Sequence, residues 1–181
     1  MTIKQSVCYP MMKPESIPID AFVAEVAAMG FAAIELWNRG DDFDEVVSSA
    51  RSCGLAIATM SGHDSLGVGL NDPSQHDRIE AELRMSIDIA ADAGIPGVIC
   101  FSGNRREGVS EEEAIEATVE GFQGIVPYAE SKGVNLNMEL LNSKVDHPGY
   151  QCDHSDWGLE VCKRVNSPNV KLLYDIYHMQ I

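Results

Sequence analysis

The sequence repeats one order of segments: a short apolar run, a polar loop, a longer amphipathic stretch, and a glycine before the next apolar run. Near-continuously apolar runs of this length are typical of strands buried on both faces, as in parallel sheets covered by helices. A glycine after an amphipathic stretch marks the place where a left-handed residue ends a helix. The order therefore predicts repeated strand–helix units in a single domain, residues 1–181.

The same pattern gives the bounds of the expected elements. The predicted strands are 3–8, 32–37, 55–60, 97–101, 134–140 and 170–174, and the predicted helices are 19–29, 43–53, 76–93, 110–131 and 157–165. An open doubly wound sheet and a closed barrel both fit this order. No glycine-rich fingerprint follows the first strand, where Tyr9 to Met12 stand instead, so the pattern somewhat favours the barrel over a dinucleotide-binding fold.

Charge and composition limit the partners that we expect. The 181 residues carry 28 acids and 13 bases, a formal net charge of −15, which repels nucleic-acid backbones and anionic membranes. The sequence has no apolar run long enough to cross a bilayer and no apolar signal-peptide core. Its five cysteines are widely spaced and form no Cys-x-x-Cys pair, as in a cytoplasmic protein with reduced thiols. We expect a small-molecule substrate, no nucleic acid or membrane partner, and leave a homo-oligomer open.

Two acids stand at the ends of neighbouring predicted strands, where functional residues collect in both architectures. Glu139 lies within the apolar run of the fifth strand, and Asp175 follows the sixth. A carboxylate buried there must be paired, protonated or bound to a cation, and a salt bridge between strands is the structural alternative. Only Lys144 and Lys171 are near in sequence. The pair of acids therefore favours a divalent cation, Mg²⁺ or Mn²⁺.

Other candidates near the strand ends each allow two interpretations. Glu35 is expected either to contact substrate or to form an ion pair in the core. His63 and His178 are expected to contact a substrate oxygen or a metal, or to face solvent. His147 lies in the loop after the fifth strand, which could form part of a lid, although histidines in loops are usually exposed. Arg105 is expected to be a solvated loop charge.

Four segments resemble the xylose-isomerase-like superfamily of barrels and, within it, the hydroxypyruvate isomerase family. They are NMELLN at 137–142, DIYHM at 175–179, GLNDPS at 69–74 and ICFSGNR at 99–105. The resemblance covers essentially the whole chain, and its combination of an acid on the fifth strand with Asp-x-x-His after the sixth is fairly specific for the superfamily.

The resemblance implies a (β/α)₈ TIM barrel, of which about six βα units lie in this chain and the last two do not. It implies one divalent metal held by Glu139 and Asp175, with His178 on a substrate oxygen and two further ligands on later strands. It also implies a metal-dependent isomerase of a sugar or hydroxy-keto acid, working by proton transfer through an enediolate, with Glu139 as a base. Hydroxypyruvate is the best-matched substrate.

Three alternatives remain beside that function. A ketose 3-epimerase would use the same parts. A metal-dependent endonuclease for abasic DNA would need a basic face, which the net charge of −15 disfavours. A barrel fragment, or half of a two-chain assembly, is expected to be inactive by itself and to aggregate or assemble through its open strand edges.

Overall fold

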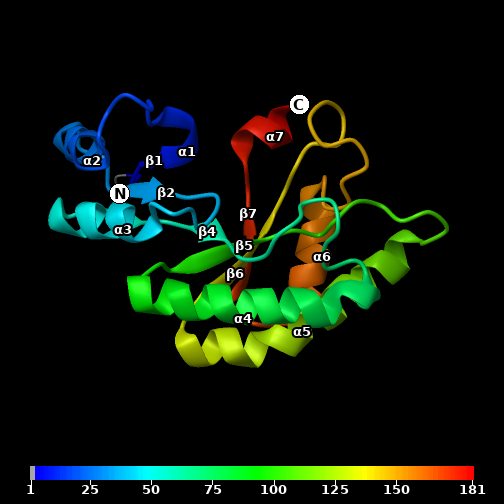
Figure 1. Cartoon of the computed structure of the whole chain (residues 1–181). Helices are drawn as coiled ribbons and strands as arrows, with labels where there is room; N and C mark the ends of the chain where they lie inside the picture. Colours follow the sequence, from blue (N-terminus) through cyan, green and yellow to red (C-terminus); the bar gives the residue numbers. More distant parts are fainter. Residues whose placement is uncertain (1–2) are drawn as a thin grey trace.

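The computed structural model describes residues 3–181 and shows parallel strands joined by helices (Figure 1). The strands are β1 (Ser6–Cys8), β2 (Ala33–Glu35), β3 (Ala56–Ile57), β4 (Met60–Ser61), β5 (Gly97–Cys100), β6 (Asn135–Glu139) and β7 (Val170–Leu173). The α-helices are α1 (Tyr9–Met12), α2 (Ile19–Ala28), α3 (Phe43–Ser52), α4 (His76–Ala93), α5 (Glu111–Lys132), α6 (Ser155–Val165) and α7 (Ile176–Gln180), and a 3₁₀ turn, η1 (Pro73–Gln75), precedes α4.

All strand pairs are parallel, in the orders β1-β2-β3 and β4-β5-β6-β7. The predicted third strand, 55–60, is divided: β3 pairs with β2, and β4 pairs with β5. One main-chain and one side-chain hydrogen bond bridge the division. Leu36 N–H donates to Thr59 O at 3.0 Å, and the Thr59 hydroxyl donates to Gly97 O at 3.1 Å. One chain segment thus turns from one neighbour to the next, as a curving sheet requires.

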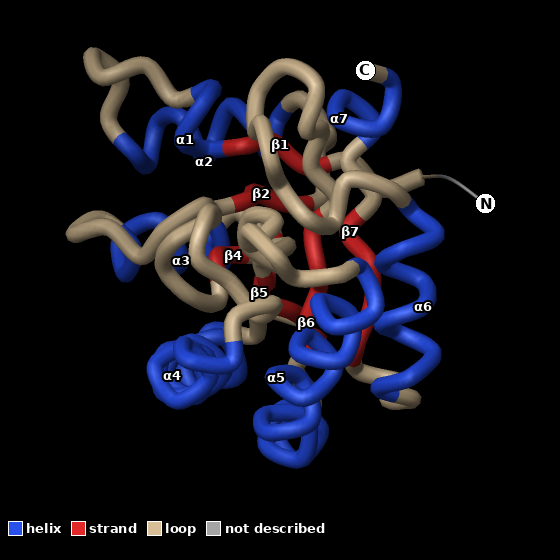
Figure 2. The backbone as a smooth tube through the Cα atoms, turned by 90° about the vertical axis from the view of Figure 1, so that its right-hand side faces the viewer, coloured by secondary structure: helices blue, strands red, loops and turns tan. Residues whose placement is uncertain are grey.

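The strands follow an arc, with α3, α4, α5 and α6 on its outer side (Figure 2). This arrangement is the predicted partial (β/α) barrel. The predicted apolar stripe of α4 is confirmed: Ile79, Leu83, Ile87 and Ala90 are its buried residues. Burying each of the larger aliphatic side chains stabilises the helix–sheet packing by about 1.5–3 kcal/mol. Within residues 3–181, no helix combines the length and apolar character that a membrane crossing needs.

Helix ends follow the sequence signals closely. Ser110 and Glu113 form the predicted capping box at the start of α5. Gly94 and Gly133 end α4 and α5 with φ of 72° and 69°, a conformation that costs a residue with a Cβ atom. The short helices α1 and α7 were not predicted. Asp175 is the N-cap of α7 and accepts a hydrogen bond from the main-chain N–H of His178.

Candidate active site

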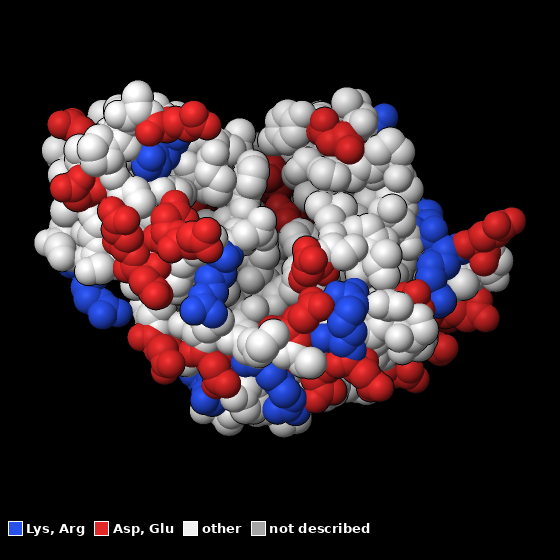
Figure 3. Space-filling view, viewed as in Figure 1, with Lys and Arg blue, Asp and Glu red and all other residues white. Residues whose placement is uncertain are grey.

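The carboxyl ends of the strands open onto one cavity of about 660 Å³. Every predicted site residue lines it, from four different strand ends: Glu35, His63, Glu139, Asp175 and His178. Figure 3 shows a deep hollow between two lobes of the same face, with acidic atoms inside it. The strand ends therefore converge, as the parallel arrangement predicts.

Strand register brings the two predicted metal ligands to the same side of the sheet. Glu139 is the register partner of Leu173, and Asp175 lies two residues beyond Leu173. Side chains two residues apart along a strand point to the same face. Both carboxylates thus face the cavity, and neither points into the helix layer.

Glu139 is half-buried, and its pKa is raised to about 7, first by burial and then by the negative charges of Asp175 and Glu35. Among residues 3–181, no Lys, Arg or His side chain forms an ion pair with any of these three acids. A cluster of like charges without a basic partner is the electrostatic setting that a bound cation relieves. The donor set, all carboxylate oxygen, fits a hard divalent ion.

The described residues do not form a complete metal cage. Within 3–181, no group of three or more His, Cys, Asp or Glu side chains is arranged to hold an ion. Of the Asp175 oxygens, Oδ1 accepts from the His178 N–H at 3.1 Å, which leaves Oδ2 for another partner. The residues present therefore fit a site in which Glu139 and Asp175 contribute two of the ligands.

Glu35 is tied to the neighbouring strand by a hydroxyl group. The Ser6 hydroxyl on β1 donates to the Glu35 carboxylate on β2. The core ion pair considered for Glu35 is not formed with any described residue. Glu35 lies at the cavity wall, where its carboxylate helps to raise the pKa of Glu139.

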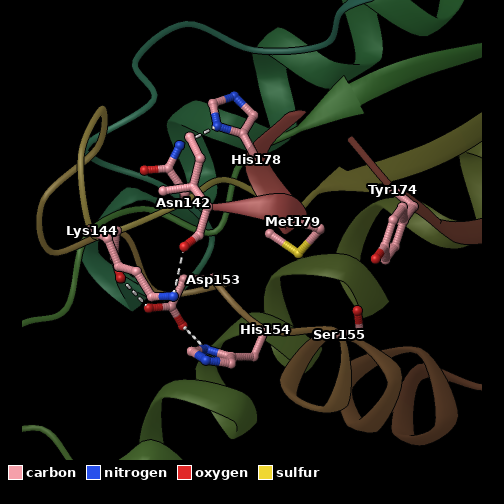
Figure 4. Close-up of a pocket in the computed structure, with 10 residues that line it drawn as sticks. Asn142, Lys144, Asp153, His154, Ser155, Tyr174, His178 and Met179 are labelled. Carbon is pink, nitrogen blue, oxygen red and sulfur yellow. Dashed lines mark hydrogen bonds and ion pairs between the residues drawn. The ribbon is translucent and has the colours of Figure 1, made fainter. Parts of the chain in front are cut away.

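His178 does not face solvent. Its side chain is only 12% exposed, and its ring packs 5.2 Å from that of His147, measured between centroids. The Asn142 amide lies 2.7 Å from Nδ1 of His178 (Figure 4). His147 also lines the cavity, the less usual of the two positions considered for this loop histidine.

His63 is fully engaged by the main chain. The Phe101 N–H donates to Nε2 at 2.9 Å, so Nε2 is an acceptor and Nδ1 carries the proton that it donates to Asp64 O at 3.1 Å. Burial lowers the pKa of His63, in keeping with a neutral ring. These bonds favour a structural role, in which His63 joins the ends of β4 and β5, over the predicted substrate contact.

A second network ties the loops behind the cavity. Arg105 is exposed, as expected for a loop charge, and its guanidinium binds both carboxylate oxygens of Asp153, at 2.9 and 3.1 Å. The Ser143 hydroxyl also donates to the Asp153 carboxylate. Nδ1 of His154 lies 2.6 Å from Oδ1 of Asp153 (Figure 4). Although burial raises the pKa of Asp153, the bonds from Arg105, Ser143 and His154 outweigh it and lower that pKa to about 2.

Two glycines let the loops after β4 and β5 touch. A Cβ atom on Gly69 would lie 2.3 Å from the Gly103 nitrogen, and one on Gly103 would lie 2.5 Å from the Gly69 nitrogen. Main-chain bonds cross the same contact, including Leu70 N–H to Phe101 O at 3.1 Å and Asn71 N–H to Ser102 O at 2.9 Å. No sequence pattern predicted this contact, although GLNDPS and ICFSGNR contain both glycines.

Comparison with known proteins agrees with this geometry. Residues 23–181 match the family described as "Xylose isomerase-like TIM barrel". The chain is similar to a Streptomyces coelicolor protein named "Putative hydroxypyruvate isomerase", at 26% identity over 91% of this chain and 65% of that protein. It is also similar to an L-ribulose 3-epimerase of Methylomonas sp., at 28% identity over 67% of this chain and 45% of that protein. The chain thus spans about 65% of the length of the Streptomyces relative.

Among solved structures, an AP endonuclease, family 2, from Brucella melitensis superposes with a TM-score of 0.83. The alignment covers 99% of this chain and 71% of that chain, at 19% sequence identity. At that identity the likeness concerns the fold.

Proposed function

The chain belongs to the xylose isomerase-like TIM-barrel family, and from this premise we propose that its cavity isomerises a hydroxy-keto acid or sugar through an enediolate. One observation carries the proposal: Glu139 and Asp175 face one cavity beside Glu35 and His178, without a basic partner among the described residues. This set can remove a proton from carbon and hold the oxygens that gain negative charge.

Glu139 is the proposed base. Its carboxylate is half-buried and receives no hydrogen bond from any described side chain, so it is poorly solvated and ready to accept a proton. It takes the proton from the hydroxyl-bearing carbon, and a protonated carboxyl group returns a proton to the neighbouring carbonyl carbon. The proton of the hydroxyl group passes to the former carbonyl oxygen, so that hydroxyl and carbonyl exchange places. The products differ from the reactants only in the positions of two hydrogen atoms, so no redox partner is required.

Glu139 and Asp175 are also the residues that would hold a divalent metal, Mg²⁺ or Mn²⁺. Such an ion, when bound, supplies Lewis acidity that polarises the substrate carbonyl and stabilises the enediolate. The His178 ring positions a substrate oxygen, and the apolar wall that includes Phe101 and Leu141 excludes water from the reacting carbons.

Hydroxypyruvate, converted to tartronate semialdehyde, is the proposed substrate, and similarity to the Streptomyces protein supports it. A ketose 3-epimerase is the second candidate, supported by similarity to the Methylomonas enzyme. Proton removal next to a carbonyl is common to both reactions. Cleavage of abasic DNA is not proposed, because the net charge of −15 repels a phosphate backbone.

A paired assay tests the proposal. The purified protein is incubated with hydroxypyruvate, or with ketoses such as ribulose, in the presence of Mn²⁺, Mg²⁺ or EDTA. We expect tartronate semialdehyde to form with metal and to be lost with EDTA. Epimerised ketose without semialdehyde would transfer the proposal to the second candidate. Absence of both products from folded, metal-loaded protein would contradict an isomerase.

A further inference from the structure

Asn142 is oriented without ambiguity by the loop that follows β6. Its Oδ1 accepts hydrogen bonds from the main-chain N–H groups of Val145 and Asp146, both at 3.0 Å. If the amide oxygen and nitrogen were exchanged, the NH₂ group would face two main-chain N–H groups, and none of these donors would have an acceptor. The other end of the side chain, Nδ2, is therefore the donor.

That donor has two acceptors. Nδ2 donates to Asp146 Oδ2 at 2.7 Å. It also lies 2.7 Å from Nδ1 of His178 (Figure 4). Because Nδ2 has only hydrogens to offer, Nδ1 of His178 must present its lone pair. In a neutral imidazole one nitrogen accepts and the other carries the hydrogen, so the hydrogen is on Nε2.

We infer that Asn142 is a positioning residue that fixes His178 as the Nε2–H tautomer, so that the ring presents a hydrogen-bond donor to the cavity. His178 lines the cavity, and Nε2 has no hydrogen-bond partner among residues 3–181. His63 has the opposite arrangement, with Nε2 as acceptor and both nitrogens bound to main chain. Of these two rings, only that of His178 keeps a free N–H.

The tautomer sets the chemistry that this corner of the cavity recognises. A fixed N–H binds an oxygen that accepts, such as a carbonyl or an enediolate oxygen, and its bond strengthens as negative charge develops there. This consequence rests on the proposed function, whereas the tautomer itself does not. The class of ligand is therefore an α-hydroxy carbonyl compound whose carbonyl oxygen points at His178.

Nitrogen NMR of ¹⁵N-histidine protein tests the tautomer directly, with His178 assigned by the signals lost in His178→Gln. We expect Nδ1 to resonate as a lone-pair nitrogen and Nε2 as a protonated one. Asn142→Asp should reverse the two, because a carboxylate accepts from Nδ1–H while still accepting from the Val145 and Asp146 amides. Asn135→Asp, which adds the same charge at the opposite end of β6, should leave the His178 signals unchanged.

A second measurement needs no variant. With asparagine labelled as well, a scalar coupling across the N–H···N bond should join Asn142 Nδ2 to His178 Nδ1 in the wild-type protein. A protonated Nδ1, an absent coupling, or unreversed signals in folded Asn142→Asp would each overturn the inference. An inactive wild type with the expected tautomer would contradict the proposed function alone, and an active one with the opposite tautomer would contradict this inference alone.

Discussion

The hydroxyl of Tyr150 donates a hydrogen bond to the main-chain oxygen of Glu139, at 3.1 Å. The same hydroxyl accepts from the Ser102 N–H, also at 3.1 Å. Tyr150 is fully buried, and its hydroxyl joins the two chain segments just beyond the last paired residues of β5 and β6. The backbone of the proposed base is thus held from the loop that follows its own strand.

Tyr150→Phe should destabilise the protein by about 1–3 kcal/mol, because it leaves a buried N–H and a buried carbonyl without their partner. It should also lower kcat several-fold, since Glu139 loses the group that fixes its main chain. Urea unfolding and steady-state kinetics measure the two effects. Tyr128→Phe is the matched control, because Tyr128 bonds Asp88 at the surface. Equal stability losses in the two variants would argue against a buried-network role for Tyr150.

Glu139→Gln should lower kcat by about 10²–10⁴-fold, the usual contribution of a general base, with a much smaller change in KM. The amide keeps the shape of the side chain and loses its charge and its basicity. Glu116→Gln, an exposed change on α5, is the control and should leave both constants unaltered. Unchanged kcat for Glu139→Gln in metal-saturated buffer would remove Glu139 from catalysis.

Asp175→Asn should act through metal affinity. Asparagine still caps α7, so the fold should persist. Loss of a charged ligand should weaken Mn²⁺ binding by more than the roughly 10–100-fold that loss of an outer-shell partner costs. Calorimetric titration with Mn²⁺ measures the affinity, and excess Mn²⁺ should restore part of the activity. Asp156→Asn, on the outer helix α6, should bind Mn²⁺ like the wild type; equal affinity in Asp175→Asn would exclude Asp175 as a ligand.

Asp153 gives a prediction about acid stability. Its folded pKa of about 2 lies below its ordinary value of 3.8, so the unfolded chain binds the proton more tightly. Its contribution is therefore complete above about pH 4 and is lost as the pH falls towards 2, with a size of about 2 kcal/mol. The free energy of unfolding, measured in urea at several pH values, should differ between wild type and Asp153→Asn near neutral pH. The difference should shrink in acid.

The exposed Asp92→Asn serves as the control for that comparison and should follow the wild type at every pH. A gap between wild type and Asp153→Asn that stays constant from pH 7 to pH 2 would mean that the Arg105 pair does not depend on the ionised carboxylate.

Much of the fold follows from local patterns in the sequence. Apolar runs, the Ser110 capping box and the glycines after helices located the six predicted strand segments and the long helices within a few residues. The division of segment 55–60 was missed, because pairing partners are chosen by curvature of the whole sheet and not by the segment itself. The helix α1 was missed because a single turn has no periodicity to detect.

The candidate site was partly predictable for a similar reason. Parallel strands bring their carboxyl ends together, so Glu35, Glu139 and Asp175 could be expected in one cavity. The roles of His63 and His178 could not be separated, because both follow a strand and differ only in what their ring nitrogens meet. Asn142 and Tyr150 act through bonds whose partners come from other segments, and their contacts arise only in the folded chain.

The contact between Gly69 and Gly103 has a consequence for engineering this cavity. At these two glycines the loops after β4 and β5 meet backbone to backbone, so no side chain at that point can absorb a change in length or shape. If one loop alone were replaced by the loop of a relative, it would not match the surface of the loop that it contacts. Replacing both loops together would preserve the contact between them. Libraries that aim to alter substrate range are therefore better built by recombining both loops as one cassette, with the two glycines held constant.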